Sequence, residues 1–444
     1  MVARFALFGL VLTLLPAATL SAQGLSEEEA RIVAFVDAHL EEAIDLLEAS
    51  VNINSGTLNP EGVYAAGEHI RPHFEALGLT TRWATVPDSL ERAGHLVAER
   101  TGSQGQRLLL IGHLDTVFEP DSPFQTYARD GDRATGPGVS DMKGGNIVLL
   151  YALKALHAVG ALEGTTITAV LTGDEERPGR PISVSRAALI EAAQRSDVAL
   201  GFEGSARAGG QEYATIARRS SSGWTLQVTG RQNHSSGVFS ARAGYGAIYE
   251  LARILNAFRE ELVGEPYLTF NPGVVLGGTT LSYDAATSQG AAYGKTNVIA
   301  PTALAVGDIR TITNQQLDET RARMEAIVER HLPGTSAEIT FTDGYPSMPP
   351  TEGNRALMEV LSGINRDLGR TSMQAFDPGH RGAADSSFVA PYVKAGLAGV
   401  GVYGAGAHGP HESIDLASLP VVMKRAALLV YRLTRPGADP LSTD

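Results

Sequence analysis

The chain has 444 residues, of which 43% are hydrophobic and 19% charged, a globular composition that is too long for one ordinary core. The net charge is −13 and there is no cysteine. Nucleic acid and anionic membranes would therefore repel the protein, and disulfides, thiolate metal sites and cysteine nucleophiles are excluded. Any metal must be bound by His, Asp and Glu.

The first predicted element is an export signal at residues 1–22. Arg4 precedes an apolar run from Phe5 to Pro16, and small residues follow up to Ala22. The run is shorter than the roughly 20 residues that a membrane span needs, which favours a cleaved signal peptide over a membrane anchor. We expect cleavage near Ala22 and a mature protein that is periplasmic or secreted, with no membrane contact.

Short apolar runs that lead to polar residues predict an α/β domain. The expected strands are 108–112, 166–171, 198–202 and 398–402, and a helix is expected from about 143 to 159. Continuous apolar strands that alternate with helices are typical of a mainly parallel sheet covered on both faces. Such sheets place their sites at the ends of their strands.

From 217 to 333 the pattern changes to half-exposed strands and amphipathic helices. Strands are expected at 224–229, 268–276, 297–312 and 337–342, with helices at 245–262 and 317–328. The order β-α-β-β-α-β is that of a ferredoxin-like unit. The sequence therefore predicts a split α/β catalytic domain, 23–216 and 334–444, interrupted by an inserted α+β domain at 217–333.

Polar residues at the strand ends are candidate metal ligands, although each has an ordinary structural alternative. His113 and Asp115 are two residues apart and would point the same way, but a solvated strand end looks the same. Asp141 precedes a helix and could be its N-cap. Glu175 and Glu176 are adjacent, so their side chains diverge, and one could bind a metal while the other moves a proton.

Two further strand ends complete the candidate set. Glu203 follows an apolar strand, and His408 and His411 lie in a glycine-flanked segment near the C-terminus. Together these positions offer histidines and carboxylates suited to zinc, cobalt or manganese. A carboxylate that bridges two ions about 3.5–4 Å apart would give a two-metal hydrolase.

The chain resembles the co-catalytic di-zinc exopeptidases, which include glutamate carboxypeptidase, aminoacylase, acetylornithine deacetylase and succinyl-diaminopimelate desuccinylase. The similar segments are 112–117, 138–145, 172–176, 202–203 and 408–412, in this order through nearly the whole mature chain. Glu203, after Leu200-Gly201-Phe202, looks most like the glutamate carboxypeptidase branch.

The resemblance implies two Zn²⁺ per subunit, with Co²⁺ or Mn²⁺ as substitutes. The implied ligands are His113, Asp141, Glu176, Glu203 and His408. Asp141 would bridge the ions, with His113 and Glu203 on one of them. The family usually has Asn or Asp where this chain has His411, so His411 remains an alternative to His408.

The resemblance also implies catalytic and substrate-binding roles. Glu175 would be the general base for a water activated by two zinc ions, and Asp115 would orient His113. His234 would hydrogen-bond the oxyanion in a partner subunit's site, which implies a homodimer; an exposed loop histidine is its structural alternative. Asn297 and Arg310 match positions linked to substrate contact, and an arginine can bind a carboxylate in bidentate fashion.

The expected function is that of a metal-dependent, glutamate-carboxypeptidase-like exopeptidase or amidohydrolase. It would cleave the amide bond to a C-terminal amino acid in a small N-acyl or peptidyl substrate. An aminoacylase or a dipeptidase would use the same chemistry. A catalytically silent, metal-containing binding protein is an alternative of another class, but such a protein would be expected to lose Glu175 or Asp115, and both are present.

Overall fold

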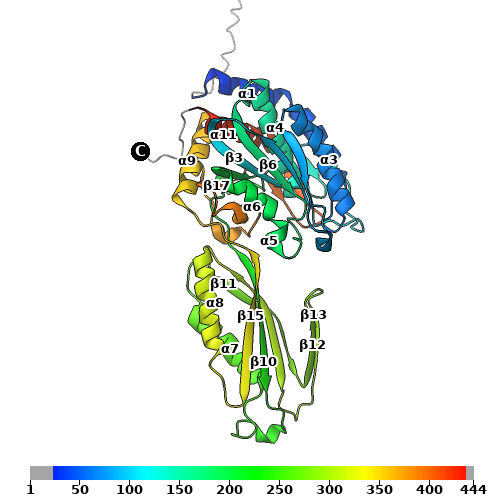
Figure 1. Cartoon of the computed structure of the whole chain (residues 1–444), viewed down its shortest axis with the longest axis vertical. Coiled ribbons are helices and arrows are strands. Elements are labelled where there is room, and N and C mark those ends of the chain that lie inside the picture. The colour runs from blue at the N-terminus through cyan, green and yellow to red at the C-terminus, as the bar shows by residue number, and fades with distance from the viewer. Residues whose placement is uncertain (1–23, 437–444) are drawn as a thin grey trace, which may run out of the picture.

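The computed structural model describes residues 24–436, so the expected export signal lies outside the described residues. Figure 1 shows a larger domain that holds both ends of the described chain and a smaller domain joined to it by a narrow junction. Among the helices of residues 24–436, none is long and apolar enough to cross a membrane.

The larger domain is built on a six-stranded sheet in the order β1-β2-β6-β3-β7-β17. Its strands are β1 (Thr80–Ala84), β2 (His95–Arg100), β3 (Gln104–His113), β6 (Thr165–Thr172), β7 (Val198–Gly201) and β17 (Ala395–Ala398). β2 runs antiparallel to its neighbours, whereas β6, β3, β7 and β17 are parallel. The carboxyl ends of these four strands therefore meet at one edge.

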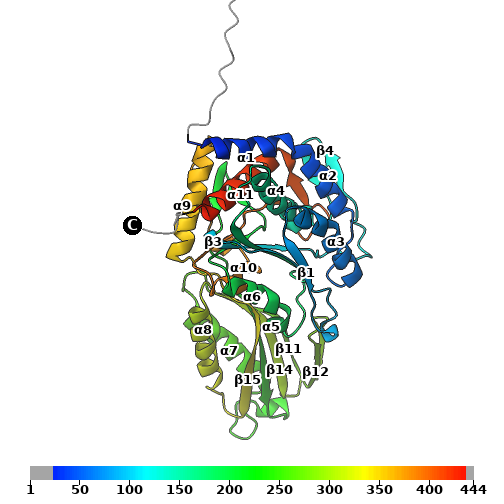
Figure 2. The same cartoon turned by 45° about the horizontal axis from the view of Figure 1, so that its top comes forward.

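Helices cover both faces of this sheet, because alternate strand residues point to opposite sides. Leu108 and Leu110 of β3 enter one core, whereas Leu109 and Ile111 enter the other. The first face carries α1 (Glu27–Ala38), α2 (Leu40–Val51), α3 (Pro60–Ala76), α4 (Gly144–Ala158), α9 (Glu352–Asp367) and α11 (Leu419–Thr434). On the face toward the smaller domain lie α5 (Ile182–Ser185), α6 (Ala187–Gln194) and α10 (Ser386–Val389), as Figure 2 shows.

Two small sheets and several short helical turns complete the larger domain. One sheet has the order β18-β19-β5-β4 and the other the order β16-β9-β8. Their strands are β4 (Ala128–Asp130), β5 (Arg133–Thr135), β8 (Ala206–Ala208), β9 (Gln211–Ala214), β16 (Gln374–Ala375), β18 (Gly404–Ala405) and β19 (Ser413–Asp415). The turns are η1 (Asp88–Leu90), η2 (Val139–Lys143), η4 (Pro378–His380) and η5 (Leu416–Ser418).

The smaller domain is a four-stranded antiparallel sheet with two helices on one face. Its elements are β10 (Ser221–Gly230), η3 (Ser235–Gly237), α7 (Ala247–Leu262), β11 (Thr269–Gly278), β14 (Thr302–Arg310), α8 (Asn314–Val328) and β15 (Thr335–Tyr345). Strand order β11-β14-β10-β15 and the β-α-β-β-α-β sequence are those of a ferredoxin-like unit. The α/β fold with an inserted α+β domain is therefore confirmed.

Two features of the smaller domain differ from the expectation. β15 pairs with β10 from Thr335 opposite Gly230 to Tyr345 opposite Ser221, so the fourth strand of this sheet lies beyond the boundary expected at 333. The boundary was expected at the loop after α8, which separates that strand from its sheet. Local sequence pattern does not show which strands pair, so it could not place this boundary correctly. A hairpin of β12 (Thr280–Asp284) and β13 (Gln289–Tyr293) was also unforeseen; its strands are short and largely exposed.

Candidate metal centre

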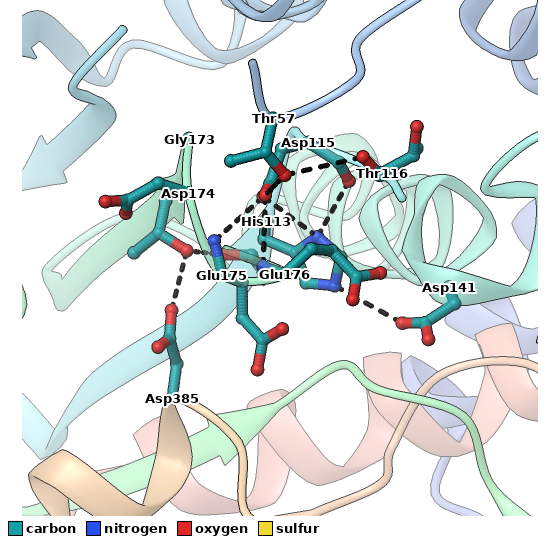
Figure 3. A network of polar contacts seen from close by, with 12 residues as sticks. Thr57, His113, Asp115, Thr116, Asp141, Gly173, Asp174, Glu175, Glu176 and Asp385 are labelled. Carbon is teal, nitrogen blue, oxygen red and sulfur yellow. Dashed lines mark hydrogen bonds and ion pairs between the residues drawn. The ribbon is translucent and has the colours of Figure 1, made fainter. Parts of the chain in front are cut away.

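The strand ends of the main sheet bring candidate ligands together (Figure 3). His113 is the last residue of β3, Glu203 follows β7, and Glu175 and Glu176 follow β6. Nε2 of the buried His113 lies 3.3 Å from Oδ1 of Asp141 and 3.9 Å from Oε1 of Glu203. Residues that are far apart in the chain therefore form one cluster, because neighbouring parallel strands end at the same edge.

His113 presents its Nε2 atom to this cluster. Its Nδ1 atom lies 3.0 Å from the main-chain oxygen of Asp115. A carbonyl oxygen only accepts hydrogen bonds, so Nδ1 carries the proton and the lone pair of Nε2 is free to bind a cation. This arrangement, in which a neighbour fixes the tautomer of a histidine ligand, is common at metal sites.

Asp141 lies between the two histidines. Its Oδ1 is 3.3 Å from Nε2 of His113, and its Oδ2 is 3.2 Å from Nε2 of His408. Nε2 of His408 is also 3.1 Å from Oε2 of Glu176. Potential ligand atoms thus form two groups that share His113, one with Asp141 and Glu176 and the other with Glu175 and Glu203, each within 4.8 Å.

Glu412 holds the loop that carries Asp141. Its carboxylate is fully buried and accepts hydrogen bonds from the main-chain N–H groups of Gly138, Ser140 and Asp141 at 2.7–3.0 Å, and from the Ser140 hydroxyl at 3.0 Å. Gly138 has φ 71°, a conformation that favours glycine. Sequence analysis gave Glu412 no role, although it belongs to the C-terminal segment 408–412.

Asp115 holds the segment that carries both glutamates. Its Oδ1 accepts a hydrogen bond from the main-chain N–H of Glu175 at 3.0 Å, and Oδ2 accepts one from that of Glu176 at 3.0 Å. The hydroxyl of Thr57 donates a third at 2.6 Å. Asp115 is fully buried. Its carboxylate therefore fixes the positions of neighbouring residues.

The two glutamates diverge, as adjacent residues in an extended segment do. Figure 3 shows the side chain of Glu176 turned toward Asp141 and that of Glu175 turned away from it. Burial, together with the negative charge of Glu203, raises the pKa of Glu175 well above its usual value. A carboxyl whose pKa is raised in this way has the affinity for a proton that a general base needs.

The electrostatics of the cluster fit a pair of bound cations. Burial raises the pKa of Glu176 to about 7, and hydrogen bonds to Asp141 and Glu176 raise the pKa of His408 to about 11. Oε1 of Glu176 is buried and has no hydrogen-bond partner among residues 24–436. Carboxylates this close together repel one another unless positive charge lies between them, and imidazole and carboxylate are ligands that zinc accepts.

Two arginines near the cluster were missed by sequence analysis. Arg381 lines a cavity of about 270 Å³ together with Asp141 and Glu203. Its Nε is buried without a hydrogen-bond partner within the described chain, and burial lowers its pKa to about 10, which leaves it charged at neutral pH. Arg218 is buried beside it, with Nη2 3.6 Å from Oε2 of Glu203.

His408 and His411 have different surroundings. His408 contacts Asp141 and Glu176, as given above, and has φ 63°, in the left-handed region. His411 is exposed, and within the described residues it has no ion pair with a carboxylate of the cluster. The structure therefore brings only His408 of this pair to the candidate metal centre.

The three residues expected in the smaller domain lie at its opposite ends. Arg310 ends β14 near the junction, where its guanidinium lies beside Gly382 and is paired with Asp308 at 2.9 Å. His234 follows the far end of β10, and Ser235 beside it donates a hydrogen bond to the main-chain oxygen of Asn297. The ten residues of β10 span about 30 Å, so His234 and Asn297 are remote from the metal centre of their own chain.

Comparison with known proteins gives relatives for nearly the whole chain. Carboxypeptidase G2 of Pseudomonas sp. (strain RS-16) is 28% identical over 400 residues, which are 88% of this chain and 89% of the relative. Aminopeptidase PepT of Bacillus cereus has a TM-score of 0.68 at 16% identity, over 88% of this chain and 98% of its own.

A third relative is the YXEP protein of Bacillus subtilis, described as a dinuclear metal binding peptidase from the M20 family. It has a TM-score of 0.60 at 15% identity, over 90% of this chain and 99% of its own. At these identities the structural likeness shows the shared fold. Residues 109–432 match the profile of peptidase family M20/M25/M40, and the chain, a hydrolase with candidate metal-binding groups, belongs to this family.

Proposed function

We propose that this protein is a di-zinc exopeptidase or amidohydrolase that releases a C-terminal amino acid from small N-acyl or peptidyl substrates. The observation that carries the proposal is the position of Asp141, with one carboxylate oxygen 3.3 Å from His113 and the other 3.2 Å from His408. A carboxylate placed in this way can bridge two cations. His113 and Glu203 would bind one ion, and Glu176 and His408 the other.

The residues around this centre would each have a distinct role in amide hydrolysis. Two bound zinc ions would polarise the scissile carbonyl and lower the pKa of the attacking water toward about 7. Glu175 would take a proton from the water at its carboxylate and deliver it to the leaving amine. Asp115 would keep His113 and the main chain of Glu175 in place through the hydrogen bonds described above.

The cavity beside the centre supports recognition of a free α-carboxylate. Arg381 and Arg218 bring two positive charges next to Glu203, and Arg381 keeps a buried donor atom unpaired within the described chain. A carboxylate could accept from such a guanidinium in bidentate fashion. Arg310 lies beside the same loop, at Gly382, and would be a second contact for the substrate.

We further propose a homodimer in which His234 and Asn297 complete the partner subunit's site. Several large apolar side chains of the smaller domain are exposed: Phe239, Ile248, Tyr249, Val275 and Tyr293 are each at least 49% exposed. Phe239 packs edge-on against Tyr249, and Ile248 lies against Gly277 of the edge strand β11. Exposed apolar side chains in such number on one small domain favour a protein–protein contact surface there.

Carboxypeptidase G2, as a relative over most of the chain, favours the carboxypeptidase type, whereas an aminoacylase or dipeptidase would use the same residues. A catalytically silent binding protein is disfavoured, since Glu175 and Asp115 are both retained. The apolar run at 5–16 supports export to the periplasm or the medium. N-terminal sequencing of the mature protein would test the export proposal, with a start near residue 23 as the expected result.

The function is tested by metal content and product release. The purified protein, loaded with zinc, should bind two ions and release amino acids from a panel of N-acyl and N-peptidyl amino acids. His408→Ala should bind one ion fewer, whereas His411→Ala should keep both. Two zinc ions bound without hydrolysis of any panel member would favour the catalytically silent alternative. Loss of an ion in His411→Ala, and not in His408→Ala, would mean that His411 is the ligand in place of His408.

A further inference from the structure

The last residue of the smaller domain's sheet contacts the proposed general base. Tyr345 ends β15 at the junction, and its hydroxyl donates a hydrogen bond to the main-chain oxygen of Glu175 at 2.6 Å. The same hydroxyl accepts one from Nη2 of Arg186 at 2.8 Å. The tyrosine ring packs edge-on against Phe388, with ring centroids 4.9 Å apart.

Arg186 is the centre of a buried polar network behind Glu175. It is fully buried, and every nitrogen of its guanidinium donates: Nε to Asp385 at 2.6 Å, Nη1 to Asp174 at 2.6 Å, and Nη2 to Tyr345 and to the main-chain oxygen of Asp174. Asp385 also accepts from the hydroxyl of Thr172 at 2.6 Å. Figure 3 shows Asp174 and Asp385 on the side of Glu175 away from Asp141. A buried network with all donors satisfied is rigid.

The main chain of Glu175 is consequently held at both of its polar atoms. Asp115 accepts from its N–H at 3.0 Å, and Tyr345 donates to its carbonyl oxygen at 2.6 Å. Its side-chain carboxyl has no hydrogen-bond partner of its own in residues 24–436 that would orient it. The direction of this carboxyl is therefore set through its backbone.

We propose that Tyr345 is a positioning residue for Glu175, and that through it the smaller domain aligns the base. The inference rests on the proposed function, in which Glu175 moves the proton. A second contact joins the same two segments: Nη1 of Arg180 donates to the main-chain oxygen of Asp343 at 2.8 Å. Both contacts attach the end of β15 to the loop after β6, so a shift of the smaller domain would reach Glu175 directly.

The test is Tyr345→Phe, which removes the hydroxyl and keeps the ring against Phe388. We expect kcat to fall about tenfold, with KM and the content of two zinc ions unchanged, because misalignment of a base affects the chemical step. Tyr431→Phe is the matched control. It removes a hydroxyl that donates to Glu28 at 2.6 Å on the far side of the larger domain, and its kcat should equal that of the wild type.

A second measurement separates positioning from a general structural role. In the Glu175→Gln background, Tyr345→Phe should cause no further loss of kcat, because the group that it aligns no longer acts. A further tenfold loss in that background, or wild-type kcat in Tyr345→Phe alone, would overturn the inference.

Hydrogen exchange tests the same inference without any substrate. Amides of segment 173–180 should exchange faster in Tyr345→Phe than in the wild type and in Tyr431→Phe, because the carbonyl of Glu175 loses its donor. Equal exchange in all three proteins would contradict the inference. If the wild type hydrolyses no substrate of the panel, the proposed function fails, whereas exchange still decides whether Tyr345 holds this segment.

Discussion

The metal centre and the far end of the smaller domain differ in what they contain and in what they lack. At the candidate metal centre, half-buried carboxylates and two histidines converge, and neighbours of the same chain hold them in place, as Glu412 holds the loop of Asp141. At the far end of the smaller domain, His234 and Asn297 are exposed, next to one another and remote from that centre.

This difference shows which parts of the proposed mechanism a single chain can supply. The proposed ligands and the base all come from the larger domain, whereas an oxyanion contact from His234 requires a second copy of the chain. The smaller domain nevertheless contributes to its own site at the junction, where Tyr345 contacts Glu175. In the proposed dimer, the junction end of the smaller domain's sheet would therefore contact the site of its own chain, and the far end would contact the site of the partner subunit.

The strongest effect is expected at the metal centre, from Glu175→Gln. Loss of the base should lower kcat by about 10²–10⁴-fold, since general-base catalysis contributes this much, while two zinc ions remain bound. Steady-state kinetics and elemental analysis on the same sample check both parts. A variant that keeps near-normal kcat would show that another group takes the proton and would remove the main chemical argument for this centre.

His234→Ala tests the opposite side of the comparison. Removal of an oxyanion donor should lower kcat by about 10²–10³-fold with little change in metal content. Mixing His234→Ala with Glu175→Gln under conditions of subunit exchange should restore activity, because one site of each hybrid dimer then has both groups. Absence of any recovery in verified hybrids would place His234 outside the partner's site.

The arginines at the cavity should give a smaller effect, on substrate binding. Arg381→Met keeps the length of the side chain and removes its charge, so KM for substrates with a free α-carboxylate should rise about 10–100-fold, as expected for loss of a hydrogen bond between charged groups. Arg310→Met is the comparison variant, and substrates with an amidated carboxyl are the control. A larger effect from Arg310→Met would indicate that Arg310, the residue expected from the sequence, binds the substrate carboxylate.

The last prediction concerns stability. It contrasts the candidate metal centre with Glu212, a carboxylate whose positively charged partners are arginines of the chain itself. Burial acts to raise the pKa of Glu212, but hydrogen bonds from Arg370 and Arg425 outweigh it and lower the pKa to about 2. A carboxyl whose pKa is lower in the folded state than in the unfolded state stabilises the fold at pH values above its unfolded-state pKa. This stabilisation is lost as the pH falls through its folded-state pKa.

The free energy of unfolding of Glu212→Gln should therefore lie about 3 kcal/mol below that of the wild type at pH 6, and the gap should close between about pH 5 and pH 2. Urea denaturation at several pH values measures the gap. Glu329→Gln, at an exposed position, should show no gap at any pH. A gap that stays constant down to pH 2 would mean that the charge of Glu212 is not what stabilises this region.

Much of the site was predictable because its residues lie at the ends of apolar strands. Once 108–112, 166–171 and 198–202 are assigned to parallel strands of one sheet, the residues that follow the carboxyl ends of these strands must lie close together. Arg381 and Arg218 were not predictable in this way, because they lie in segments without periodicity. Only packing shows that Arg218 lies beside Glu203, that Arg381 lines the same cavity, and that both guanidinium groups remain partly unpaired within the described residues.

The sequence by itself determined the α/β class, the inserted α+β domain and the residue types of the centre, because hydrophobic periodicity and strand-end chemistry are local properties. Only the tertiary structure shows that His408 contacts Asp141 and that His411, three residues away, does not, since the fold of the loop determines which imidazole reaches Asp141. It also moved the end of the inserted domain from 333 to beyond β15 and brought Tyr345 to Glu175, because strand pairing and contacts between distant segments depend on the whole chain.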